Sequence, residues 1–236
     1  MIAMPINQES SVGSRIVEYL KSEGVEIIFG QGELSLKDVQ KHALANGIKM
    51  VGPHHESAGI WMAAAYYRLT GVAQVAMGAQ GPGVANLVPG ALWARAEFIP
   101  VIIIGACRQG IVVQGVRRGI FLHGHADSVF DAMRDACKFA RRITHPRLVD
   151  EVMQAAFREA LSGTPGPVYI EIDYAGQCET WCYRPLPEPC QYRLLRQYAA
   201  QQDIDQAVKM ISSARRPILL GGDEIYSTRT QHLFRN

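Results

Sequence analysis

Segments that read as strands alternate with stretches of helical apolar spacing through most of the chain. Six segments are expected as strands: VEIIFG (25–30), residues 49–52, AQVAM (73–77), PVIIIG (100–105), residues 138–142 and PVYIEI (167–172). The stretches between them predict helices near residues 16–20, 34–45, 56–69, 82–95, 127–134 and 146–161. This alternation is typical of parallel crossover units. We therefore predict an α/β domain over residues 1–174, with a doubly wound, mostly parallel sheet and helices on both faces.

Three of the expected strands run directly into glycine-bearing segments. These are IIFGQGE (27–33), AMGAQGPG (76–83) and IIIGACRQG (102–110). Ligands of doubly wound sheets bind beyond the carboxyl ends of the strands. We therefore expect these three segments to lie along one edge of the sheet and to carry the chemistry of the domain.

The regular alternation stops after residue 174. Residues 175–202 contain Pro185, Pro187 and Pro189 and then a polar cluster, which predicts an extended linker. An amphipathic helix is expected at 204–214 and a strand at ARRPILLGG (214–222). Residues 203–236 thus read as a partial second α/β unit, too short to fold alone.

Composition narrows the classes of function. The chain has 24 Lys plus Arg against 22 Asp plus Glu, and 48% of it is hydrophobic, which is typical of a folded soluble protein. The small net charge makes nucleic acid and anionic membrane poor partners, and no apolar stretch approaches the roughly 20 residues of a membrane span. Because the start of the chain does not read as a signal peptide, a cytoplasmic location is expected.

The cysteines do not predict a disulfide framework or a metal site. Five thiols, expected to be reduced, are spread over 236 residues. The cluster of Cys178, Cys182 and Cys190 lacks the paired spacing and the fourth ligand of a zinc site. We predict no metal ligands.

Glu56 is the most informative single residue, because it opens the helix HHESAGIWMAAAYYRLTG (54–71) at the predicted ligand-binding edge. Two readings are open. It is either a solvated acid favoured by the helix dipole or a carboxylic acid held among apolar neighbours, where it shares a proton with a bound base. His54 and His55 are expected to shape the start of this helix rather than to act as catalysts.

The turn Gly81-Pro82-Gly83 precedes another helix. Glycine allows close backbone approach, and the first turn of a helix offers free N–H groups, so a planar or anionic ligand fits there. The alternative is a tight turn without a ligand. The segment is not a phosphate loop, since neither GxxxxGK[ST] nor GxGxxG occurs, and a stand-alone nucleotide-binding domain is therefore disfavoured.

Taken together, these segments resemble the N-terminal, pyrimidine-binding domain of thiamine diphosphate dependent enzymes of the acetolactate synthase, benzoylformate decarboxylase and pyruvate decarboxylase superfamily. The resemblance rests on IIFGQGE against the family's FGxPG, on HHESAGIWMAAAYYRLTG, on GPGVAN against GPGxxN, and on PVIIIG, GTPGPVYIEI and ARRPILLGG. It covers nearly the whole chain.

The resemblance implies a role for each matching residue. Glu56 takes the position of the glutamic acid that hydrogen-bonds the aminopyrimidine, favours its imino tautomer and so promotes loss of the thiazolium proton. Other positions match the loops and the helix that line the pyrimidine ring: Gln31, Gly32, Gln80, Gly81, Pro82, Gly83 and Asn86. For each of these the alternative is a purely structural role in a turn.

His123 and His125 occupy the loop in which family members place a Gln, Glu or His near the substrate. Histidine exchanges protons near neutral pH, so both are candidate catalytic groups; the alternative is a loop pair without a ligand. The chain also departs from the family pattern. Gly32 and Glu33 replace the proline and glycine of FGxPG, Gln80 replaces a small hydroxyl residue, and His54 replaces an arginine.

The resemblance further implies that two domains bind the cofactor together. In the family the diphosphate is bound through Mg²⁺ on a C-terminal domain whose motif does not occur here. We therefore expect the N-terminal part of an enzyme acting on a 2-oxo acid, a decarboxylase or acetolactate synthase-like transferase. It would be completed as a homo-oligomer or by a separate C-terminal chain, and FAD binding is known in some relatives. The alternative is a non-catalytic truncated or partner subunit that uses the dimerisation surface.

Overall fold

The computed structural model describes residues 8–107, 111–113, 116–118, 129–173, 176–194, 198–222, 225 and 230–234. The chain divides into two compact units, Met1–Arg193 and Leu194–Asn236. None of the helices in the described ranges is long and apolar enough to cross a membrane.

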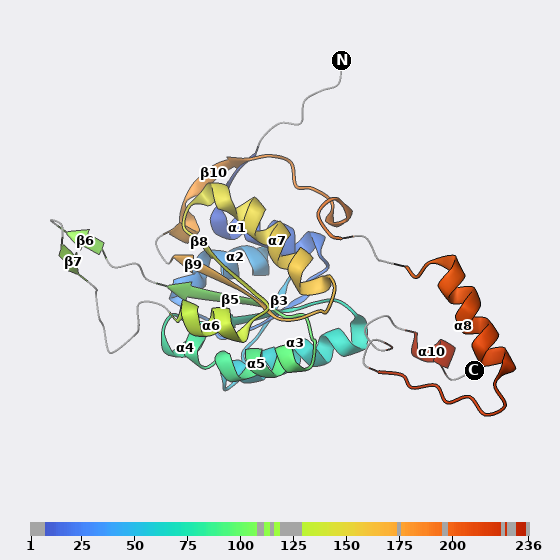
Figure 1. Cartoon of the computed structure of the whole chain (residues 1–236). Coiled ribbons are helices and arrows are strands. Elements are labelled where there is room, and N and C mark those ends of the chain that lie inside the picture. Colours follow the sequence, from blue (N-terminus) through green and yellow to red (C-terminus); the bar gives the residue numbers. More distant parts are fainter. Residues whose placement is uncertain are drawn as a thin grey trace, which may run out of the picture. The chain divides into compact units, whose positions relative to one another are not determined.

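A six-stranded parallel sheet forms the centre of the first unit (Figure 1). Its order is β3-β2-β4-β5-β9-β8, and every neighbouring pair is parallel. The strands are β2 (Ile27–Phe29), β3 (Lys49–Val51), β4 (Val75–Gly78), β5 (Ile102–Cys107), β8 (Phe139–Ile143) and β9 (Val168–Asp173). All six were predicted, and the doubly wound α/β fold is confirmed.

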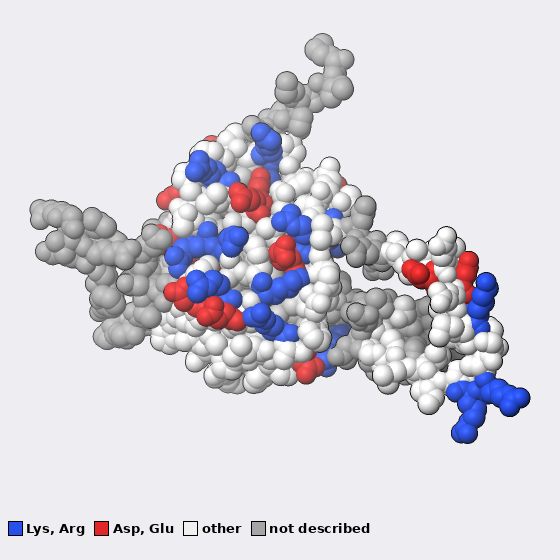
Figure 2. Space-filling model, viewed as in Figure 1, with Lys and Arg blue, Asp and Glu red and all other residues white. Residues whose placement is uncertain are grey.

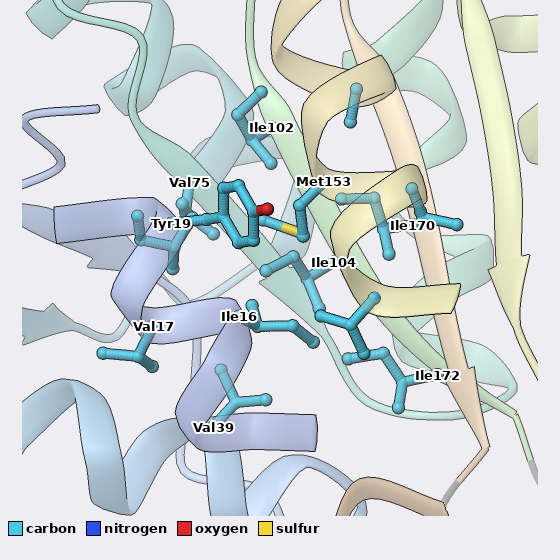
Figure 3. Close-up of a cluster of buried hydrophobic side chains, with 14 of the residues drawn as sticks. Ile16, Val17, Tyr19, Val39, Val75, Ile102, Ile104, Met153, Ile170 and Ile172 are labelled. Atoms are coloured by element: carbon cyan, nitrogen blue, oxygen red, sulfur yellow. The ribbon is translucent and has the colours of Figure 1, made fainter. Parts of the chain in front are cut away.

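Two layers of helices bury the two faces of the sheet (Figure 1). One layer contains α1 (Val12–Ser22), α2 (Lys37–Ala45) and α7 (Val149–Leu161), and the other contains α3 (Glu56–Thr70), α5 (Val88–Ala96) and α6 (Phe130–Ala136). Side chains alternate between the layers along β5: Ile102 and Ile104 pack with the first layer and Ile103 with the second. Figure 3 shows Ile102 and Ile104 beside Tyr19 and Met153 in the core of the first layer.

A charged cluster lies within the sheet. Glu171 of β9 is fully buried, and its carboxylate accepts hydrogen bonds from Arg142 Nε at 2.5 Å and from the Tyr169 hydroxyl at 3.1 Å. Arg142 is the register partner of Glu171 on β8, and Gly105 is its partner on β5. A Cβ on Gly105 would meet the Tyr169 oxygen at 2.5 Å, so glycine makes room for the cluster. Burial, followed by the nearby Glu171 carboxylate, raises the pKa of Tyr169 well above its ordinary value.

The predicted helix at 82–95 is divided into α4 (Pro82–Ala85) and α5. Pro89 is one cause, since it is the second residue of α5 and has no N–H to bond the carbonyl of Ala85. The break places Asn86 between the two helices, at the edge of the sheet where ligands were expected.

Residues 176–193 are not the extended linker that their prolines indicated. Within them lie η3 (Gly176–Cys178), β10 (Thr180–Tyr183) and η4 (Pro189–Gln191), and β10 pairs antiparallel with β1 (Gln8–Ser11). Tyr183 and Tyr192 are buried in the core of the first unit. The prolines gave no indication of these contacts with residues far away in the sequence. Because of the contacts, the first unit ends at Arg193 rather than at the expected residue 174.

Arg15 of α1 connects this segment to the core. Its guanidinium is 3% exposed and donates to both carboxylate oxygens of Asp150, at 2.7 and 3.2 Å, and to the carbonyl of Arg184 at 2.9 Å. It also stacks over the rings of Tyr19 and Tyr183. One buried cation thus joins α1, α7 and the segment that follows β10.

The remaining elements differ in part from expectation. A short antiparallel pair, β6 (Ile111–Val113) and β7 (Val116–Arg118), was not predicted. In the second unit α8 (Gln201–Ser213) matches the expected helix, and α10 (Gln231–Phe234) follows. The strand expected at 214–222 is wrong: these residues are not in a strand, and Ile218 and Leu220 are more than 90% exposed. An apolar run needs neighbouring strands to become part of a sheet.

Charges of both signs lie side by side on part of the visible surface of the first unit. Figure 2 shows blue and red side chains interleaved on that face, in keeping with the formal net charge of +2.

We expect Arg15→Ala to lower the free energy of unfolding by about 3 kcal/mol, because it leaves the Asp150 carboxylate without its partner. Urea unfolding measures this loss, and limited proteolysis should show faster cleavage within 176–193. Arg68→Ala is the matched control, since Arg68 pairs with Glu97 at the surface with side chains 49% and 40% exposed; its loss should cost about 1 kcal/mol or less. Equal losses for the two variants would contradict the role assigned to Arg15.

Stability should also fall in alkaline solution. Burial is the main cause that raises the pKa of Tyr192 to about 12, above the value near 10 of an unfolded tyrosine. The unfolded chain therefore releases this proton first, and the free energy of unfolding decreases as the pH rises from 10 to 12. In urea unfolding at several pH values, Tyr192→Phe should show a shallower decrease than the unaltered chain. The exposed Tyr198 provides the control variant Tyr198→Phe, and an undiminished slope in Tyr192→Phe would refute the prediction.

Candidate functional site

The carboxyl ends of β3, β2 and β4 lie next to one another at one edge of the sheet, because these strands are adjacent and parallel. The segments that leave this edge are 30–33 after β2, 52–55 after β3 and 79–81 after β4. The edge therefore brings together the glycine-bearing segments after β2 and β4 and the start of α3, as predicted. The third predicted segment, 102–110, contains β5, which is the next strand beside β4, and its residues 108–110 lie outside the described residues.

Glu56 is the first residue of α3, and His55 caps the helix. The backbone of His55 is extended, with φ −139° and ψ 137°, and its Nδ1 accepts a hydrogen bond from the Ser57 N–H at 3.2 Å. His55 thus shapes the start of the helix, as the sequence indicated, while His54 is exposed. Further along, a Cβ on Gly59 would lie 2.9 Å from the Phe29 carbonyl oxygen. Glycine at this position lets α3 pack directly against the end of β2.

The turn after β4 also depends on glycine. Gly81 has φ 69° and ψ −112°, a conformation that L residues with side chains rarely adopt. Gly83 stands close to the start of α3, since a Cβ there would lie 3.3 Å from Glu56 Oε1 and 2.9 Å from the Ala79 Cβ. A side chain at this position would therefore crowd Ala79 and the Glu56 carboxylate, so glycine lets the turn pack closely against the start of α3.

Asn86 holds the other oxygen of this carboxylate. Its Nδ2 donates to Glu56 Oε2 at 3.0 Å. Among the described residues no Lys or Arg forms an ion pair with Glu56, which is half-buried. The neutral amide orients the carboxyl group without adding a charge. Oε1, on the Gly83 side, accepts no hydrogen bond from the described residues.

Ser57 is a member of this site that the sequence reasoning missed. Its hydroxyl donates to the Asn86 carbonyl at 2.5 Å and accepts from the Gly90 N–H at 3.1 Å. No sequence signal marks it, because a serine in the first turn of a helix is common and its partners lie about 30 positions away.

The other predicted residues have the following places. Gln31 and Gly32 are exposed after β2, and Gln31 Nε2 donates to the Pro53 carbonyl at 2.8 Å, which ties this segment to the start of α3. Nothing lies within 4 Å of a Cβ built on Gly32. Gln80 is half-buried and Pro82 is exposed. His123 and His125 lie outside the described residues, so their role stays a prediction.

Glu33 has a local structural task. Its side chain accepts a hydrogen bond from the Ser35 N–H at 3.1 Å and so caps η1 (Leu34–Leu36). Glu33, which departs from the family pattern, thus stabilises the first turn of η1. Across the described ranges, no three His, Cys, Asp or Glu side chains are grouped in a way that could hold a metal ion.

Comparison with known proteins identifies the family. Residues 10–137 match the profile described as "Thiamine pyrophosphate enzyme, N-terminal TPP binding domain", where thiamine pyrophosphate is the diphosphate named above. The match covers more than half of the chain, which therefore belongs to this family.

Relatives match over most of the chain. It is 28% identical over 225 residues to the probable acetolactate synthase large subunit of Methanocaldococcus jannaschii, covering 93% of this chain and 37% of that protein. It is 28% identical to the acetolactate synthase isozyme 1 large subunit of Escherichia coli, over 89% of this chain and 36% of the relative. It is 26% identical to the oxalyl-CoA decarboxylase of Escherichia coli, over 92% and 39%. The chain thus spans less than two fifths of the length of these relatives.

Removing the cap should show how far α3 depends on His55. We expect His55→Ala to lower the free energy of unfolding by about 1 kcal/mol, as loss of a helix cap usually does. Asparagine is a strong cap, so His55→Asn should recover most of the loss. Hydrogen exchange at the Ser57 amide, combined with urea unfolding, measures both effects. If alanine and asparagine destabilised the chain equally, the capping role would be excluded.

Proposed function

We propose that this chain supplies the pyrimidine-activating half of a thiamine diphosphate site in an enzyme that acts on a 2-oxo acid. The observation that supports this most directly is the Glu56 carboxyl, with one oxygen bonded to the Asn86 amide and the other beside Gly83. A carboxylic acid oriented in this way can share a proton with a ring nitrogen. Membership of the thiamine pyrophosphate enzyme family supplies the identity of the ring.

Each residue at this edge of the sheet would have its own role in binding the pyrimidine ring. Glu56 would hold or donate a proton at Oε1, and Asn86 would keep the carboxyl group turned toward the ligand. Gly81 and Gly83 would let the ring approach the backbone, with Gln80 and Pro82 at the sides of the turn. Gln31 and Gly32 would border the ring from the segment after β2. When bound, thiamine diphosphate supplies the nucleophilic carbon for the reaction.

The diphosphate and Mg²⁺ would be held by another segment of polypeptide. The described part of the chain offers no candidate group of metal ligands, and hard cations such as Mg²⁺ need oxygen ligands together with the phosphates. We propose that this segment belongs to a C-terminal domain, in another copy of a longer chain or in a separate one. The apolar side chains exposed on and after α3 and α5 offer a contact surface: Trp61, Met62, Leu92 and Phe98 are 41–52% exposed.

A decarboxylase or an acetolactate synthase-like transferase is the reaction class that we propose. The relatives are named as acetolactate synthases and as an oxalyl-CoA decarboxylase. His123 and His125 remain our candidates for acid–base groups on the substrate side.

The alternative function is that of a non-catalytic partner subunit, favoured by the same exposed apolar surface. Mixing the chain with a separately produced C-terminal domain that binds diphosphate and Mg²⁺ distinguishes the enzymatic function from the non-catalytic one. The enzymatic proposal predicts thiamine diphosphate that stays bound through gel filtration and turnover of a 2-oxo acid. Stable association without either would favour the partner subunit.

Glu56→Gln tests the proposed function on the chain itself. Glutamine keeps the shape but cannot share the acidic proton, so saturation transfer from the protein to the pyrimidine protons of thiamine diphosphate should fall at least fivefold. In an active complex with a C-terminal domain, turnover should fall by about 10²-fold or more. Glu97→Gln, which changes a carboxylate at the far end of α5 that pairs with Arg68, is the control. Unchanged transfer and turnover in Glu56→Gln would reject the proposal.

A further inference from the structure

The Ser57 hydroxyl occupies an unusual place, between two backbone groups of another segment. It donates to the carbonyl of Asn86 and accepts from the N–H of Gly90. These two groups are four residues apart, which is the spacing that bonds directly in a continuous α-helix. A side chain inserted at such a point opens the helix.

The break between α4 and α5 lies at this point. α4 ends at Ala85 and α5 begins at Val88. Pro89 removes one backbone donor from the same turn, and the Ser57 hydroxyl takes up the next one, at Gly90. Ser57 is 1% exposed, and its two hydrogen bonds satisfy the Asn86 carbonyl and the Gly90 N–H without water.

The packing around Ser57 fixes the distance between the helices. A Cβ on Gly90 would lie 3.1 Å from the Ser57 Cα and 3.0 Å from the Ile60 side chain. The two helices therefore touch where the hydroxyl crosses, and the hydroxyl has little freedom to choose other partners.

Asn86, which accepts the hydrogen bond from Ser57, also bonds the candidate acid, Glu56. The carbonyl of Asn86 is bonded to Ser57, while its side-chain amide is bonded to Glu56 Oε2 at 3.0 Å. Asn86 itself is exposed, so its side chain is not held by surrounding packing. Its backbone is held at two points, by the Ser57 hydroxyl at the carbonyl and by the Pro82 carbonyl at the N–H at 2.9 Å, and these bonds limit the directions open to the amide.

We infer that Ser57 is a positioning residue for Glu56, acting through Asn86. The hydroxyl keeps the helix open at Asn86, and the open turn points the amide at the carboxyl group. This inference rests on the proposed function for its consequence in ligand binding, but its geometry can be tested without a ligand.

The first experiment follows the Asn86 side-chain amide by ¹⁵N–¹H NMR in the full chain. We expect Glu56→Gln to shift this signal, because the carboxylate acceptor is replaced, and Ser57→Ala to shift it as well. Ser35→Ala is the control: Ser35 is 2% exposed, its hydroxyl has no hydrogen-bond partner among the described residues, and it lies on η1. A signal that stayed in place in either Ser57→Ala or Glu56→Gln would overturn the inference.

The second experiment is a double-mutant cycle on binding of thiamine diphosphate in the presence of Mg²⁺, measured by saturation transfer. Ser57→Ala should weaken binding about fivefold to tenfold in the unaltered chain and less than twofold in Glu56→Gln, because its effect passes through that carboxyl group. A purely structural role would give the same loss in both backgrounds, which would overturn the inference. If Glu56→Gln alone left binding unchanged, the proposed function would fail, and the NMR result would still decide the role of Ser57.

Discussion

The close approach of the turn after β4 to the first turn of α3 is the constraint on which the site depends. Gly83 permits it, since a side chain there would meet Ala79 and crowd Glu56. The hydrogen bond from Asn86 to Glu56 spans the two segments, and the Ser57 hydroxyl joins them again beneath it. An acid at a helix start would ordinarily be solvated, but here its surroundings are set by backbone geometry on both sides.

The parallel sheet explains why these segments meet. β3, β2 and β4 are neighbours, so the residues that follow them leave the sheet side by side although they are far apart in the sequence. The core on both faces holds the strands in register, and the absence of a side chain at Gly59 lets α3 lie close to the Phe29 carbonyl at the end of β2. The fold thus supplies the position of Glu56, and the local hydrogen bonds supply its orientation.

Much of the fold and of the candidate site could be predicted from the sequence, because the apolar runs indicate the strands and the glycines that follow them indicate the strand ends. The six strands, the edge and the place of Glu56 all follow from such local patterns. What could not be predicted depends on partners distant in the chain. Residues 176–193 were predicted as part of a linker because their prolines can be read from the sequence, whereas the contact of Tyr192 with Glu23 cannot. Ser57 gave no signal for the same reason, and the run at 214–222 looked like a strand because its lack of neighbours cannot be read locally.

The central claim is that the Glu56 carboxyl meets the pyrimidine ring of thiamine diphosphate. Crystals of the chain in complex with a C-terminal domain that binds the diphosphate and Mg²⁺, soaked with thiamine diphosphate, test it most directly. The account predicts electron density for the ring beside Gly83, with a Glu56 carboxylate oxygen about 2.6–3.2 Å from a ring nitrogen. A ring bound elsewhere, or one at this edge whose nitrogens all bond to groups other than Glu56, would contradict it.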